Sequence, residues 1–385
     1  MSQKVIKETP KTLTSSDDLK KIVKDSIATR YVSIDIEGNG FFRYPEFVCL
    51  IQICIDEDIY LVDPLAIHDI SVLGEIFRDH KITKILHAGD YDIRSLNRDY
   101  GFSFSNVFDT SLGAALLGSK KLGLDSVLKE YIDANVTKDK KLQRSDWTIR
   151  PLSKEARTYA ADDVRYLHSA MQVMNKRLEN LGRLSWLREE CERLQQVKFH
   201  PKDEDTAFLD VKGSKNLDGR SLSVLQSLYA VREDEAIGKD RPPFKIVGDS
   251  VLVGIARNPH SDYSEIKGIG AWGRPGVSKR IRKIVTDALA QEPVERPPSK
   301  IARKSPMSNK EREKANIRLK ELKEWRKAIG QNLDVDPSLL WPTSSLNRLS
   351  RDPNTFISEV SEPEVRNWQR LEFGNKLEEK LSSFQ

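Results

Sequence analysis

The stretch SKEARTYAADDVRYL, residues 153–167, places one acidic residue on the face that a helix would bury. A serine at its start suits a helix N-cap, and apolar residues recur at helical spacing along the stretch and beyond it. Asp163 lies within this apolar stripe, whereas Asp162 is turned by roughly 100° toward the wetter side. Tyr159 lies four residues earlier on the same face as Asp163. Because a buried carboxylate requires a cation, a proton or hydrogen bonds, Asp163 predicts partners elsewhere in the chain.

The composition limits the classes of protein that the chain can be. Its 385 residues suggest two or three domains, and 38% hydrophobic residues suffice to build cores. No apolar run approaches the roughly 20 residues of a membrane span, and the first residues lack a long apolar secretory segment. We therefore expect a cytoplasmic protein without membrane contact. The chain has three cysteines, Cys49, Cys54 and Cys191, and this low number is typical of a reducing compartment, where we expect no disulfide partners. The first two lie in an apolar run, which favours a position in the core over a metal-binding or redox role.

The distribution of charge is a weak sign of a polyanionic partner. The net charge is +5, and the excess of basic residues lies in residues 201–385. One predicted helix presents a basic face made of Lys279, Arg280, Arg282 and Lys283. A solvated face of mixed charge looks similar, so both interpretations stay open.

Residues 1–200 alternate between strand and helix patterns. Strands are expected at Lys4–Ile6, Tyr31–Ile36, Phe47–Ile55, Ile59–Val62 and Ile82–Leu86. Helices are expected at Ser15–Ile27, Ile70–Arg78, Asp90–Tyr100, Leu122–Tyr131 and Ser153–Leu181, with a last helix ending near Val197. This alternation predicts an α/β domain with a central mixed sheet.

The second half of the chain contains only helix patterns and one proline-rich break at residues 291–308, which predicts an extended linker. Shifted by 94 residues, the helical segments on either side of this break match without gaps at eight positions, which are Leu225/Leu319, Leu228/Leu322, Arg232/Arg326, Asp240/Asp334, Pro243/Pro337, Leu252/Leu346, Arg257/Arg351 and Pro259/Pro353. The matches predict two copies of one helical module of about 80 residues. The expected organisation is therefore residues 1–200, a first helical module at 209–290, the linker, and a second helical module at 309–385.

Further acidic residues lie near the ends of predicted strands. Alternate residues of Tyr31–Glu37 share a face, so Asp35 and Glu37 lie side by side, roughly 6–7 Å apart. Apolar strands on both sides of this segment favour a central position in the sheet, although an edge strand with one wet face would show the same alternation. Asp92 falls in the first turn of a helix that follows a strand, a place that acidic residues also favour because of the helix dipole.

Carboxylates without histidine or cysteine suit hard cations such as Mg²⁺ or Mn²⁺. Two such ions about 4 Å apart can clamp a phosphodiester, with one activating the attacking water and the other stabilising the leaving oxygen. In this arrangement Tyr159 would position the water.

Three short motifs resemble those of a known nuclease superfamily. The segments Asp35-Ile36-Glu37, His87-Ala88-Gly89-Asp90-Tyr91-Asp92 and Tyr159-Ala160-Ala161-Asp162-Asp163 are similar to the three exonuclease motifs of the tyrosine-bearing subclass of the DEDD superfamily. The stretch from Lys141 to Leu152 resembles the one that precedes the third motif in ribonuclease D and in the related exosome-associated nuclear exonuclease, and Phe108-Asp109-Thr110 and Leu122-Gly123-Leu124 match as well. The helical modules, with Leu217-Asp218-Gly219-Arg220 and Arg241-Pro242-Pro243-Phe244, resemble the HRDC domains of ribonuclease D.

The resemblance extends nearly end to end and implies a ribonuclease H-like exonuclease domain followed by two all-α HRDC-type domains. It implies Asp35, Glu37, Asp92 and Asp163 as ligands of two divalent metal ions, Mg²⁺ or Mn²⁺, with Tyr159 orienting the water. It further implies hydrolysis of RNA from a free 3′ end, with release of nucleoside monophosphates and with transfer RNA precursors as expected substrates. The chain departs from the family directly after Glu37, where bacterial members usually carry an apolar or aromatic residue and this chain continues with Gly38-Asn39-Gly40-Phe41. The departure concerns how the terminal base is wedged.

Two other functions compete with this one, namely a catalytically silent RNA-binding scaffold and a DNA-directed 3′–5′ exonuclease.

Three additional residues are candidates for substrate binding. His87 ends a strand near the site and could touch a phosphate, although a single histidine at a strand end is more often packed or capping. Trp147 and Arg150 would stack on or grip a single strand, and a core position suits them as well.

Overall fold

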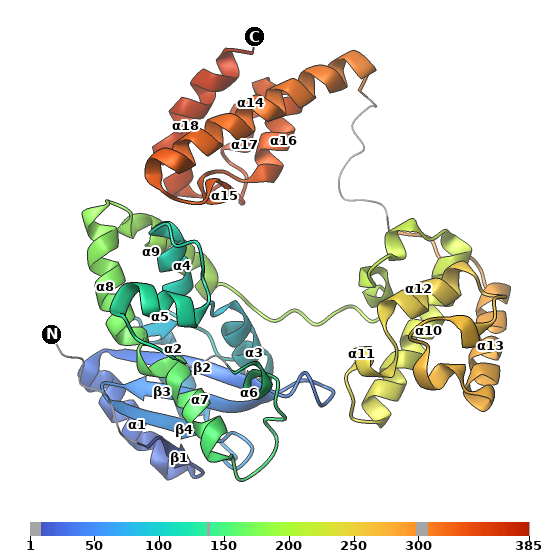
Figure 1. The fold of residues 1–385 in the computed structure, drawn as a ribbon, viewed down its shortest axis with the longest axis horizontal. Helices are drawn as coiled ribbons and strands as arrows, with labels where there is room; N and C mark the ends of the chain where they lie inside the picture. Colours follow the sequence, from blue (N-terminus) through green and yellow to red (C-terminus); the bar gives the residue numbers. More distant parts are fainter. Residues whose placement is uncertain (1–8, 137–138, 298–306, 385) are drawn as a thin grey trace.

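The computed structural model describes residues 9–136, 139–297 and 307–384 (Figure 1). Within these residues six strands form one sheet in the spatial order β1-β4-β3-β2-β5-β6. Their bounds are Lys11–Leu13 (β1), Tyr31–Gly38 (β2), Val48–Ile55 (β3), Asp58–Val62 (β4), Thr83–Leu86 (β5) and Val107–Asp109 (β6). β3 runs antiparallel to β2 and β4, whereas β2, β5 and β6 run parallel, which confirms the predicted mixed sheet. The strand predicted at Lys4–Ile6 lies outside the described residues.

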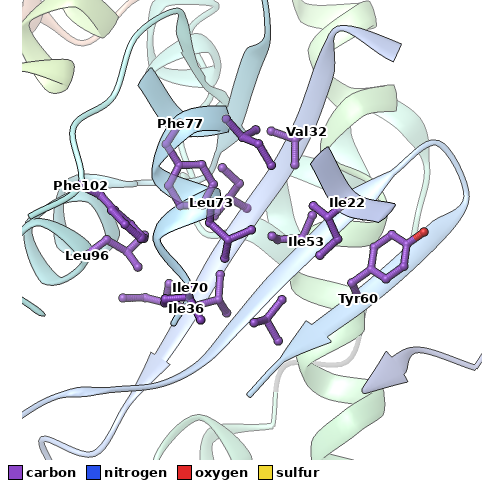
Figure 2. Packing of buried hydrophobic residues seen from close by; sticks show 14 of the residues in the cluster. Ile22, Val32, Ile36, Ile53, Tyr60, Ile70, Leu73, Phe77, Leu96 and Phe102 are labelled. Carbon is purple, nitrogen blue, oxygen red and sulfur yellow. The ribbon is translucent and has the colours of Figure 1, made fainter. Parts of the chain in front are cut away.

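β2 lies between β3 and β5, so the alternative of an edge strand is wrong. Val32, Ile34 and Ile36 point to one face, where they join a hydrophobic cluster with residues of the helices that cover it (Figure 2). Asp35 and Glu37 alternate with them and therefore point to the opposite face. The predicted alternation thus carries both carboxylates to the same side of the sheet.

Helices cover both faces of the sheet. The bounds are Ser16–Thr29 (α1), Ser71–Arg78 (α2), Asp90–Tyr100 (α3), Thr110–Leu116 (α4), Leu124–Ile132 (α5), Lys140–Gln143 (α6), Lys154–Arg165 (α7), Leu167–Asn180 (α8) and Leu184–Gln195 (α9). α1 packs on β2 and β3, and α7 crosses β2, β3 and β4 on the other face (Figure 1). The prediction of one continuous helix at Ser153–Leu181 is wrong, because the chain bends at Tyr166 so that α8 can pack on β5, α4 and α5.

The two helical modules share a common order of helices, with one additional short helix, α17, in the second. The first contains Gly219–Gly238 (α10), Pro243–Ile246 (α11), Asp249–Arg257 (α12) and Pro275–Ala290 (α13), and the second contains Asn309–Leu333 (α14), Pro337–Leu340 (α15), Thr343–Arg351 (α16), Phe356–Glu359 (α17) and Asn367–Ser382 (α18). The bounds of α11 and α12, shifted by 94 residues, are those of α15 and α16. Arg232 contacts Asp249 and Arg326 contacts Thr343, which are equivalent positions at this shift. These coincidences support the predicted duplication. Residues 298–306 of the predicted linker lie outside the described part of the chain.

The modules contact the sheet domain in different ways. The second shares a hydrophobic cluster with it, in which Trp186 of α9 stacks on Trp368 of α18 with ring centroids 4.6 Å apart. The first builds its cluster from its own residues, and its contacts with the sheet domain include the ion pair of Arg43 with Asp240. An apolar interface resists separation in water more than a polar one does. The second module is therefore the more firmly attached of the two.

The cysteines lie in hydrophobic surroundings. Cys49, Cys54 and Cys191 are free thiols, and each is buried in a hydrophobic cluster. Burial raises the pKa of each thiol to about 12, so each stays protonated at neutral pH.

None of the helices in the described ranges combines the length and the apolar character that spanning a bilayer requires.

Candidate active site

Three acidic side chains from two elements converge near the C-terminal end of β2. Asp35 and Glu37 of β2 and Asp163 of α7 each offer one carboxylate oxygen, and these oxygens all lie within 4.8 Å of one another. α7 approaches the sheet closely because its inner face carries the buried small residues Ala160 and Ala161. The helical spacing of apolar residues placed Asp163 on the inner face of α7, and this face lies against the carboxylates of β2.

Asp92 completes the group from the first turn of α3. Its side chain is buried and lines the same cavity as the other three carboxylates. The turn before α3 is held by Asp109, which accepts a hydrogen bond from the backbone N–H of Gly89 (2.8 Å) and caps α4 through two further N–H groups. Gly89 is the N-cap of α3, and the carboxylate of Asp90 pairs with Arg94. The role of Asp109 in supporting the site was not predicted, because β6, the strand that ends at Asp109, has only three residues and shows no periodicity.

The four carboxylates repel one another in a poorly solvated place. Burial raises the pKa of Asp35, Glu37 and Asp92 well above the usual carboxyl range, and the charges of neighbouring carboxylates add to each shift. Burial and the charge of Asp35 raise the pKa of Asp163 to about 9. Ionised carboxylates at this spacing require positive charge between them. The site therefore fits hard divalent cations, which prefer oxygen ligands.

Tyr159 lies beside the carboxylates in a cavity of about 740 Å³. Its ring packs against Trp147, with centroids 6.1 Å apart. Burial raises the pKa of its phenol, and the charge of Asp163 raises it further. The phenol therefore stays protonated at neutral pH and keeps an O–H that can donate to a water molecule. Asp162 also borders the cavity, and it pairs with Arg165 of its own helix at 2.9 Å.

The three candidates for substrate binding occupy different places. His87 lines the cavity, and its Nδ1 lies 2.9 Å from Oγ1 of Thr110. Trp147 is only 1% exposed and lies behind Tyr159. Arg150 forms a two-pronged ion pair with the buried Asp63, with Nη2 2.9 Å from Oδ1. For Trp147 and Arg150 the structure supports the core interpretation, because neither side chain lines the cavity. Trp147 packs against Tyr159 of the cavity wall, and Arg150 in turn donates a hydrogen bond to the backbone carbonyl of Trp147 (2.7 Å).

We expect Arg150→Ala to lower the free energy of unfolding by about 2–4 kcal/mol, because the Asp63 carboxylate would remain buried without its cation. Chemical denaturation with tryptophan fluorescence measures this loss. Arg150→Lys is the matched control and should lose less, since it keeps the charge but not the planar fork. An unchanged stability together with a higher KM for RNA would instead assign Arg150 to substrate binding.

Comparison with known proteins agrees with this geometry. The family model described as 3′–5′ exonuclease matches residues 10–179, and the HRDC domain model matches residues 221–286. Ribonuclease D of Desulfotalea psychrophila is 30% identical over 342 residues, which are 88% of this chain and 89% of that protein. The chain belongs to the ribonuclease D family. It is accordingly a 3′–5′ exoribonuclease by family.

Other ribonuclease D proteins match along nearly the whole chain. Ribonuclease D of Gluconacetobacter diazotrophicus is 28% identical over 375 residues, 95% of this chain and 91% of that protein. The crystal structure of Escherichia coli RNase D, an exoribonuclease involved in structured RNA processing, is 25% identical and superposes with a TM-score of 0.70. That match covers 98% of this chain and 99% of that structure. The ribonuclease D fold therefore includes the helical region as well as the sheet domain.

Proposed function

We propose that this ribonuclease D homologue removes nucleotides one at a time from the 3′ end of RNA, with two divalent metal ions, Mg²⁺ or Mn²⁺, held by Asp35, Glu37, Asp92 and Asp163. The observation that carries the proposal is the convergence of three carboxylate oxygens within 4.8 Å, with Asp92 beside them. When bound, such ions activate a water molecule and stabilise the leaving oxygen of a phosphodiester.

The residues of the chain have separate roles in this proposal. The four carboxylates would hold the cations, whose positive charge would offset the negative charge that otherwise repels a phosphate. The Tyr159 phenol donates a hydrogen bond that orients the attacking water, and Trp147 fixes the position of its ring. His87 lines the cavity, and in this proposal it would contact a phosphate of the substrate.

The proposed substrate is RNA with a free 3′ end, such as a transfer RNA precursor. The Escherichia coli relative is an exoribonuclease involved in structured RNA processing, which supports this choice. We further propose that residues 1–200 form the exonuclease domain, that residues 209–290 form the first HRDC domain, and that residues 309–385 form a second domain of the same type after the linker at 291–308. The repeated element bounds support the second HRDC domain.

Digestion of one RNA labelled at either end, with and without EDTA, tests the proposal. A single label at the 3′ end should be released at once as a nucleoside monophosphate, whereas a 5′ label should shift to progressively shorter lengths, and EDTA should stop both. Loss of the 5′ label as a mononucleotide from the start would contradict the direction. A parallel digestion of single-stranded DNA separates RNA from DNA preference, and absence of all hydrolysis would favour the silent scaffold.

A further inference from the structure

Two aromatic rings from different parts of the chain meet at the rim of the cavity. Phe41 lies in the β2–β3 loop, and Phe244 lies in α11 of the first helical module. Their centroids are 6.3 Å apart, and the rings meet edge to face at 79°. Phe41 is 50% exposed and Phe244 is 56% exposed, so the pair does not serve as a buried core contact. Both rings line the same cavity as the carboxylates.

The Gly38-Asn39-Gly40 segment explains how Phe41 reaches the rim. A Cβ on Gly38 would lie 2.8 Å from the Tyr91 hydroxyl, and a Cβ on Gly40 would lie 2.6 Å from a carboxylate oxygen of Glu46. Asn39 is fully buried, and its Oδ1 accepts a hydrogen bond from the backbone N–H of Phe47 (2.7 Å). The two glycines therefore leave room for the hydrogen-bonded pair of Tyr91 and Glu46, and the loop is clamped in a form that presents Phe41 to the cavity.

The same loop also docks the module that carries Phe244. The Asp240 carboxylate accepts hydrogen bonds from the Arg43 guanidinium (2.9 Å) and from the backbone N–H of Tyr44 (3.1 Å), and the Tyr44 hydroxyl donates to Glu233. Figure 1 shows the β2–β3 loop extending toward α11. Asp240 lies only four residues before Phe244, so this docking sets the position of the second ring relative to the first.

The cavity has a different chemistry at its rim and at its floor. The floor is acidic and suits cations with a phosphate, whereas the rim offers half-exposed aromatic faces. The Arg144 guanidinium lies 5.8 Å from the centroid of the Phe41 ring and lines the cavity as well. Aromatic faces beside a guanidinium are the surfaces on which unpaired bases stack.

We propose that Phe41 and Phe244 form a stacking subsite for bases at the 3′ end of single-stranded RNA, so that the first helical module supplies part of the active site. This inference rests on the proposed function. It assigns to Phe244 a direct contact with substrate, in contrast to a module that only enlarges a basic surface away from the site.

Steady-state hydrolysis of a single-stranded RNA oligonucleotide by Phe244→Ala tests the inference. We expect KM to rise roughly 5- to 30-fold with little change in kcat, because loss of one stacking partner weakens binding of the strand and leaves the carboxylates unchanged. Phe244→Trp should keep a KM near that of the wild type, and Phe244→Leu, which keeps apolar bulk without an aromatic face, should behave like Phe244→Ala. Ile237→Ala is the matched control, since Ile237 is 58% exposed in the same module and lies outside the cavity lining.

The outcomes separate this inference from the proposed function. An inactive wild-type protein would refute the proposed function itself. An active wild type with an unchanged KM in Phe244→Ala, or a KM restored by Phe244→Leu, would overturn the stacking subsite alone. Thermal unfolding shows whether Phe244→Ala is folded, and if it is not, the comparison of Phe244→Leu with Phe244→Trp decides. Asp240→Ala keeps both rings but removes their docking contact, and it should also raise KM. A wild-type KM for this variant would overturn the claim that the two docked rings form one subsite.

Discussion

Asp163→Asn should reduce the rate of RNA hydrolysis by about 1,000-fold or more while leaving RNA affinity within about threefold of the wild type. The amide keeps the shape of the side chain but removes the charge that faces Asp35 and Glu37 and would hold a cation between them. Initial rates of hydrolysis in Mn²⁺ measure the first effect. Fluorescence anisotropy of a labelled RNA in EDTA measures the second without turnover. Titration with Mn²⁺ should also show weaker metal binding.

The control for this variant is Glu155→Gln, the same carboxylate-to-amide change on the same helix. Glu155 is exposed in the first turn of α7 and away from the cavity lining, so its variant should hydrolyse RNA at the wild-type rate. Activity of Asp163→Asn near that of the wild type would refute the assignment of Asp163 as a metal ligand. Loss of RNA affinity equal to the loss of rate would point to a binding role instead.

Tyr159→Phe should lower kcat by about 10- to 100-fold and change KM by less than about twofold. The substitution removes only the hydroxyl that would orient the water, and the ring still packs against Trp147. Single-turnover hydrolysis, with enzyme in excess over RNA, measures the chemical step directly. The melting temperature serves as the control and should stay close to that of the wild type. An effect on KM alone would contradict the proposed orienting role.

Local patterns in the sequence determined the main parts of the site. Alternation along β2 placed Asp35 and Glu37 on one face, and helical spacing in α7 placed Asp163 with Tyr159. The predicted N-cap of α7 is also correct, since Ser153 accepts a hydrogen bond from the backbone N–H of Ala156 (3.1 Å). These features are predictable because the periods of strands and helices depend on residues that are close in sequence.

Contacts between distant residues were decided by the tertiary structure alone. The bend at Tyr166 follows from the packing of α8 on β5, and the role of Arg150 follows from a carboxylate 87 positions away. Phe244 reaches the cavity because Asp240 docks on a loop nearly 200 residues earlier, with 197 positions separating it from Arg43. The periodic spacing of apolar residues within a helix or strand does not predict such contacts, because they form only when distant parts of the chain come together. The sequence therefore predicted the group of carboxylates and the family, whereas the composition of the cavity rim emerged only from the way the first helical module docks.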